Sequence, residues 1–210
     1  MRKSIIAILM TFCLSIMTYA QTPRDRATEL KEQAQSSLNQ KDYIKARYLF
    51  KKAYEAFATR ENYPQAIECG VQANALYVRE NFYKEGFELC RDMDQLIWAG
   101  EQNQKKVFYD LRFLVNKERL QMYTALKNPA QAKTQLNKLE ETANLAKNDS
   151  LTEVLLYTKA NYYYTFNQNT QGDACFRKLI NQYKEKKDYA KVSDCYKTLS
   201  ELPVKPITPL

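Results

Sequence analysis

Apolar residues recur at helical spacing along most of the chain. From Asp25 to Glu201 they fall three or four positions apart with charged and amide side chains between them, and no run alternates convincingly with the period of two that marks a strand. Short breakers divide the pattern into segments. It predicts an all-α protein whose nine helices lie at residues 26–39, 43–59, 63–80, 83–98, 102–126, 129–147, 150–167, 171–185 and 188–201.

Several segment boundaries carry residues that cap helices. Asn128 precedes Pro129, whose missing N–H costs nothing in a first helical turn. Asp42 and Asp188 can cap the helices that begin beside them. These residues support the predicted starts of three helices.

Two further boundary predictions concern the middle of the chain. Residues 150–153, Ser-Leu-Thr-Glu, have the spacing of a capping box, in which serine and glutamate side chains satisfy free backbone donors. Gly100 is expected to end the preceding helix in a left-handed conformation. On this interpretation the helix from residue 102 is unusually long.

The predicted connections are short, so successive helices should run antiparallel as hairpins. The second helix of each hairpin carries a small residue, a larger residue four positions later and another three after that, which places all three on one face. The leading small residues are 40, 46 and 40 positions apart. The four sets are Ala46, Phe50 and Ala53; Gly86, Cys90 and Met93; Ala132, Leu136 and Leu139; and Gly172, Phe176 and Leu179.

These hairpins resemble the tetratricopeptide repeat (TPR) family. The best match is residues 42–53, and the first helices match through Leu156, Ala160 and Tyr163, with Tyr77 in the second hairpin. The resemblance covers about residues 26–201, although the spacing exceeds the usual 34 residues and the family's tryptophan and closing proline are missing. It implies a right-handed α-solenoid of about four antiparallel hairpins plus one terminal helix; an unrelated helical bundle is the alternative.

In proteins similar to TPRs, the first helix of each hairpin lines a concave groove where extended peptides bind. The resemblance therefore implies a set of candidate partner-binding residues; for any one of them, an ordinary wet surface is the alternative. They are Lys31, Gln35, Val71, Arg79, Lys117, Gln121, Thr124, Tyr157, Asn161 and Tyr164.

Three consecutive tyrosines stand in the stretch KANYYYTFN, residues 159–167. Successive helical residues differ in direction by about 100°, so these rings cannot form one continuous platform. We expect Tyr163 to pack in the core with Ala160 and Tyr164 to face the groove, while the direction of Tyr162 stays open.

The N-terminus has the layout of a secretory signal peptide. Arg2 and Lys3 precede an apolar run and a small-residue exit, with cleavage expected after Ala20; an uncleaved anchor is the alternative. The chain then divides into a signal peptide at residues 1–20, a helical repeat domain at 21–201 and a proline-rich tail at 202–210, which is a linker or a frayed terminus. The predicted location is the periplasm, with no stable membrane span after cleavage.

Composition argues against catalysis. The chain has no histidine, so the commonest general base and metal ligand is missing. Its four glycines form no phosphate loop. Basic residues outnumber acidic ones, 32 to 24, but both signs are interleaved, which is typical of a solvated surface and not of a nucleic-acid patch. We expect no catalytic residues, metal or cofactor, and no nucleic-acid partner.

Four cysteines remain after the predicted cleavage, an even number in an oxidising compartment. Cys69 and Cys90 are equidistant from one predicted turn, and Cys175 and Cys195 from another, so each pair is a possible disulfide that clips a hairpin. Four buried thiols are the alternative, because cysteine is a common small core residue.

Export and a tyrosine-rich helical array together resemble the extracytoplasmic sensor regions of Bacteroidota histidine kinases and related regulators. We therefore expect a non-catalytic interaction or sensory module that docks a peptide or partner protein in its concave face, with a membrane-bound signalling protein as a possible partner. The alternative is a scaffold or assembly factor of a periplasmic or outer-membrane complex.

Overall fold

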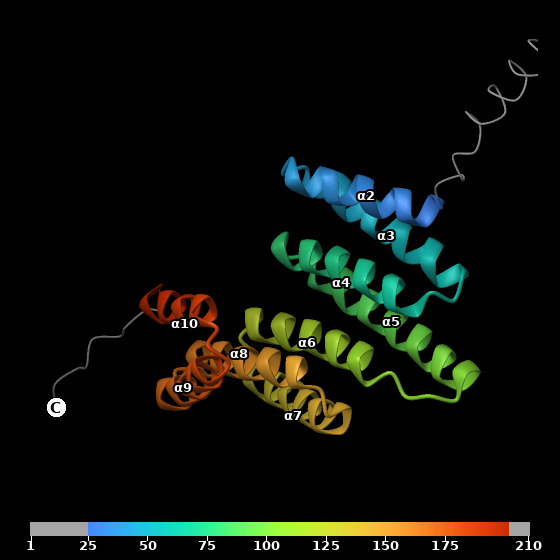
Figure 1. Cartoon of the computed structure of the whole chain (residues 1–210). Coiled ribbons are helices and arrows are strands. Elements are labelled where there is room, and N and C mark those ends of the chain that lie inside the picture. The colour runs from blue at the N-terminus through green and yellow to red at the C-terminus, as the bar shows by residue number, and fades with distance from the viewer. Residues whose placement is uncertain (1–24, 202–210) are drawn as a thin grey trace, which may run out of the picture.

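The computed structural model describes residues 25–201, and within them the chain is entirely helical with short connections (Figure 1). This confirms the all-α prediction. The helices are α2 (Arg26–Asn39), α3 (Tyr43–Thr59), α4 (Tyr63–Arg79), α5 (Tyr83–Gln104), α6 (Tyr109–Ala125), α7 (Pro129–Ala146), α8 (Asp149–Thr165), α9 (Asn169–Glu185) and α10 (Tyr189–Glu201).

One turn design joins most of these helices. One or two residues after the end of each helix from α2 to α9, a residue adopts a left-handed conformation, and the next N–H usually donates to a carbonyl five residues back, as from Asp42 to Ser37. No left-handed residue in the described part is glycine, although each such residue costs about 1 kcal/mol. They recur every 20 residues on either side of the α5–α6 connection: Lys41, Glu61 and Asn81, then Lys127, Lys147, Asn167 and Lys187.

Most of the predicted caps are present. The side chain of Asp42 accepts a hydrogen bond from Lys45 N at 3.2 Å, and that of Asn128 accepts one from Gln131 N at 3.1 Å, with Pro129 in the first turn of α7. Asp188 caps α10 in the same way, through Lys191 N. These predictions are confirmed, because capping depends on residues adjacent in sequence.

The predicted capping box at residue 150 is wrong. α8 begins one residue earlier, and its N-cap is Asn148, whose side chain accepts from Ser150 N at 3.0 Å. Glu153 is not used for capping: its carboxylate accepts hydrogen bonds from Lys186 and Lys191, beyond the next helix. The glutamate that the capping box would use to accept a backbone hydrogen bond is therefore paired with these two lysines instead.

The predicted end of a helix at Gly100 is also wrong. α5 continues to Gln104, and Gly100 lies inside it as a buried contact point for the rings of Tyr63 and Phe108. A Cβ at this position would lie only 2.8 Å from Phe108 and 2.9 Å from Tyr63. The extra length in the array therefore belongs to α5, and α6 has 17 residues like most of its neighbours.

The helices stack as antiparallel pairs into an α-solenoid. The pairs α2/α3, α4/α5, α6/α7 and α8/α9 follow one another, and α10 continues the array from α9 (Figure 1). First helices also contact one another, α4 with α6 and α6 with α8. The core runs along the array as three clusters of buried side chains, spanning α2 to α6, α6 to α8 and α8 to α10.

All four cysteines of the described part are buried free thiols, so neither predicted disulfide is formed in this structure. The thiols of the first pair face different neighbours: Cys69 lies near Lys31 of α2, and Cys90 near Arg119 of α6. Burial raises the pKa of Cys69 to about 11 and that of Cys90 to about 12. At neutral pH these thiols are protonated and poorly nucleophilic.

The predicted signal peptide at 1–20 and the tail at 202–210 lie outside the described residues. Between residues 25 and 201, no helix combines the length and apolar character that a membrane span requires.

Candidate functional site

A groove opens between the first helices of the third and fourth hairpins, α6 and α8. Its volume is about 420 Å³, within the range of small-ligand and peptide-side-chain pockets. It brings together five of the predicted binding residues: Lys117, Gln121, Thr124, Tyr157 and Asn161. The other lining residues are Leu120, Ala125, Lys127, Val154, Thr158, Tyr162 and Thr165.

The groove combines an apolar floor with a polar, basic rim. Leu120 and Tyr162 are buried at 1% and 5% exposure, whereas Val154 and Tyr157 remain 41% and 42% exposed. Lys117 and Lys127 contribute positive charge, and no acidic side chain lines the groove. The surface therefore suits a ligand that has an apolar group and a negative charge.

Short side chains explain why this junction stays open. Thr124 on α6 and Thr158 and Asn161 on α8 line the groove without reaching across it. Thr158 instead donates to its own helix, to the carbonyl of Val154 at 2.7 Å. Tyr157 rests edge-on against Phe176 of α9, with ring centroids 5.8 Å apart, so its partly exposed ring is held in place.

The preceding junction, between α4 and α6, is closed by a buried polar contact. Asn74 is fully buried, Glu118 is 2% exposed, and Asn74 Nδ2 donates to Glu118 Oε2 at 3.0 Å. Burial raises the pKa of Glu118, while the Asn74 hydrogen bond and the Lys117 ammonium, 3.5 Å from Oε1, lower it. Lys117 therefore joins the closed junction to the rim of the open one.

The predicted residues of the first two hairpins serve other contacts. Lys31 Nζ donates to Gln65 Oε1 at 2.8 Å and to Glu68 Oε2 at 2.7 Å, which ties α2 to α4. Gln35 is exposed and bonds to Asn39 one turn later. The two remaining residues of this set also pack within the solenoid: Val71 lies partly buried against the core, and the Arg79 guanidinium lies 3.9 Å from the centre of the Tyr43 ring.

The assignment of Tyr164 to the groove is wrong. Its ring covers Gly172 at the start of α9, where an added Cβ would lie 2.6 Å from the ring, and its hydroxyl bonds to Asp173. Burial is the main cause that raises the pKa of Tyr164. The glycine at position 172 was the available sequence signal, because it leaves space that a ring of a neighbouring helix can fill.

The other two tyrosines of the run also have defined places. Tyr163 packs against both C-terminal core clusters, as expected for a structural residue. Tyr162, left undecided by the sequence, is 5% exposed and forms part of the groove floor. The groove therefore gains one of the three consecutive tyrosines, but not the predicted one.

Sequence reasoning missed a second cleft, of about 480 Å³, on the side of α5, α6 and α7. Trp98 and Leu145 line it while 62% and 52% exposed. Both of its arginines are paired: Arg119 Nη2 donates to Asp94 Oδ2 at 2.5 Å, and Arg112 forms an ion pair with Glu101. The lone tryptophan and the 46-residue spacing were the signals that pointed to this irregular junction.

Comparison of the chain with protein-family models, with curated proteins and with solved structures gave no match. The candidate site therefore rests on its own geometry. That geometry supplies shape, apolar contact and hydrogen-bonding groups for holding a ligand.

Proposed function

We propose that the chain is an exported, non-catalytic interaction module of TPR-like design that docks an extended segment of a partner protein in the groove between α6 and α8. One observation carries the proposal. Five residues chosen as groove-lining on the resemblance alone, from two helices more than twenty residues apart, lie around one open groove. In the resemblance, that is the face on which peptides bind.

The lining indicates the kind of segment. Val154 and Tyr157 offer a partly exposed apolar surface for a large side chain. Gln121 and Asn161 can pair with a peptide backbone, which has both donors and acceptors. Lys117 and Lys127, with no acid in the lining, favour an acidic side chain or a terminal carboxylate.

A photo-crosslinking amino acid at position 121 tests the proposal in cells. Gln121 is exposed and lines the groove, so the label should give one discrete crosslinked product with a partner protein. A matched label at exposed Lys51 of α3 serves as the control. Equal products from both positions, or a product that survives Tyr157→Ser, would contradict groove docking.

Export and role in the cell are tested in the same samples. Mature protein that begins at Gln21 is expected in the envelope fraction. The sensory proposal, in the style of Bacteroidota receptors, predicts a membrane-bound signalling protein in the crosslinked product. A stoichiometric outer-membrane complex would favour the scaffold alternative.

A further inference from the structure

α10, the last helix among residues 25–201, leaves open a face that is covered on an equivalent helix of the array. α4 and α10 both begin with tyrosine directly after the repeated turn, so their positions can be aligned through the left-handed residues Glu61 and Lys187. In this alignment Tyr63, Ile67, Gly70 and Asn74 correspond to Tyr189, Ser193, Tyr196 and Ser200.

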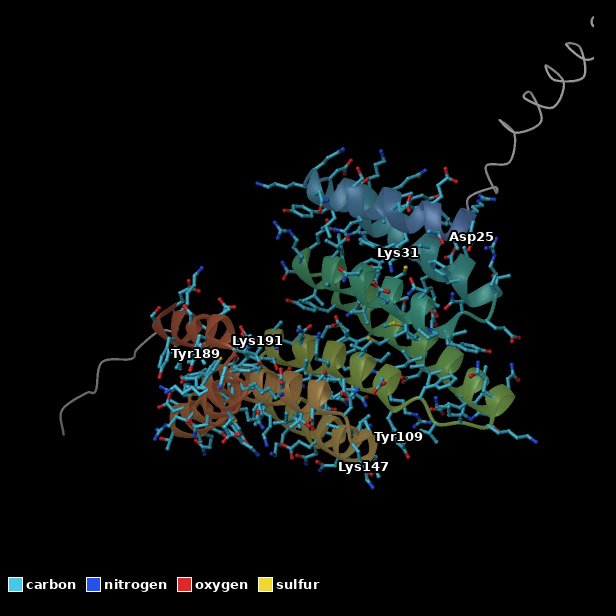
Figure 2. All side chains as sticks on the ribbon, viewed as in Figure 1. Asp25, Lys31, Tyr109, Lys147, Tyr189 and Lys191 are labelled. Atoms are coloured by element: carbon cyan, nitrogen blue, oxygen red, sulfur yellow. The ribbon has the colours of Figure 1, made fainter. Side chains whose placement is uncertain are left out.

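The two aligned faces differ completely in exposure. All four α4 positions are buried, and Tyr63 is 2% exposed because it packs on Gly100 of α5. All four α10 positions are exposed, with Tyr189 at 66% and Tyr196 at 51%. Figure 2 shows Tyr189 at the α10 end of the array, remote from Lys31 on α2. The hairpin-forming face of α10 is therefore built but has no covering helix within residues 25–201.

We infer that α10 of a second copy of this chain covers this face, as an antiparallel two-fold pair. The exposed positions alternate large and small side chains, Tyr-Ser-Tyr-Ser, at the spacing of one helical stripe. In an antiparallel register centred between Ser193 and Tyr196, each tyrosine lies opposite a serine of the other copy. A two-fold interface requires this kind of self-complementarity.

Charge also favours pairing with an identical helix. The four face residues are neutral, so bringing two copies together places no like charges in the centre. Beside the face, Lys197 and Asp194 are both exposed. Their opposite signs leave this flank of α10 without a net charge, so pairing adds no net repulsion there.

The opposite side of α10 is already in use. Val192 and Cys195 are 8% and 5% exposed and belong to the core cluster with α9. The dimer face therefore sits on an anchored helix. A single helix pair buries less than a standard interface of about 1,600 Å², so the dimer should dissociate on dilution. This inference does not depend on a ligand in the groove.

Sedimentation equilibrium of the full chain over a wide concentration range tests the inference. We expect a monomer–dimer equilibrium, and Tyr189→Glu with Tyr196→Glu should raise its dissociation constant at least about tenfold, because tyrosines are strong interface anchors. Tyr48→Glu on α3 is the control, since Tyr48 is 61% exposed and lies on another helix. Circular dichroism checks that all variants stay folded.

A crosslinking experiment tests the register directly. Ser193→Cys should form a disulfide-linked dimer under mild oxidation, because the two copies of this position lie close to the two-fold axis. Lys51→Cys, at an exposed position on α3, should not. A protein that is monomeric at every concentration, a dimer unaffected by the tyrosine changes, or a face that takes up only a helix of a different protein would each overturn the inference.

Discussion

The inner face of the solenoid has two successive junctions built from the same kind of helix, one between α4 and α6 and one between α6 and α8. The first is filled by Asn74 and Glu118, which meet in a buried hydrogen bond of 3.0 Å. The second is lined by short polar side chains such as Thr124 and Thr158 and remains a groove of about 420 Å³.

The difference teaches that repeat geometry alone does not create the site. Neighbouring first helices either close on each other or leave a groove, and at the closed junction a buried polar side chain of one helix bonds to a side chain of the other. Lys117 belongs to both junctions, since it lies 3.5 Å from Glu118 and also lines the groove. The closed junction is expected to carry stability and the open one to carry binding.

The largest expected effect comes from breaking the closed junction. Asn74→Ala removes the 3.0 Å hydrogen bond to Glu118 Oε2 and leaves the buried carboxyl with only the Lys117 ammonium beside it, so it should lower the free energy of unfolding by about 2–4 kcal/mol. Asn161→Ala, the matched change in the open junction, should cost about 0.5 kcal/mol or less because Asn161 is exposed. Urea unfolding measures both, and equal losses would erase the contrast between the junctions.

A second experiment tests whether Tyr164 is a structural residue that packs on Gly172. Gly172→Ala places a Cβ against the Tyr164 ring and should cost about 1–3 kcal/mol through overpacking. In a Tyr164→Ala background the same change should be neutral or slightly stabilising, because alanine favours helix more than glycine. A double-mutant cycle by urea unfolding gives the coupling, and additivity of the two changes would contradict the contact.

The pH dependence of stability should report the closed junction. Burial raises the folded-state pKa of Glu118, so the folded protein binds a proton more tightly than the unfolded chain there. The stability that Glu118 contributes through its raised pKa is fully present below the pKa of the unfolded chain, near 4.5. This stability is lost as pH rises through the higher pKa of the folded protein. Glu118→Gln should therefore gain stability relative to wild type as pH rises, measured by urea unfolding at several pH values; a pH-independent difference would contradict this.

A small effect on stability is expected at the junction between α2 and α4. Lys31 is tied to Gln65 and Glu68, but the charged side chains are 28% and 48% exposed. Lys31→Ala should therefore cost at most about 1 kcal/mol, and salt should weaken the wild-type contribution. Thermal unfolding at low and high salt checks this, and a large salt-independent loss would show that the tie matters as much as the buried one.

Local features of the fold could be predicted from sequence because their causes are local. Asp42 and Asn128 cap helices through donors three residues away, so the sequence alone contains both partners. The predicted end of α5 was wrong because Gly100 serves a different purpose: it leaves space for two aromatic rings, one from α4 and one from the α5–α6 connection. Contacts between elements decide such a position, and spacing along the chain does not reveal them.

The same distinction between local causes and contacts between helices applies to the candidate site. Residues of α6 and α8 such as Gln121 and Tyr157 were found because the helical period places them on the inner face. Tyr164 was misassigned because its ring packs over Gly172 of the next helix and does not face the groove. Lys31 also lies on the predicted inner face, but its ammonium is bound to Glu68 of the neighbouring hairpin. Helical spacing predicts which way a residue points, and the neighbouring helix decides whether it stays available.

The most direct test of groove docking is the affinity of a peptide selected on the wild-type protein from a random displayed library. The account predicts that selected peptides combine an aromatic or aliphatic side chain with an acidic group. It also predicts that Tyr157→Ser weakens binding at least about tenfold while unfolding stability changes by less than about 1 kcal/mol. Tyr48→Ser on α3 should leave the affinity unchanged. Peptides that bind equally well to the Tyr157 variant, or that lose affinity with the Tyr48 variant, would contradict the assignment of the groove.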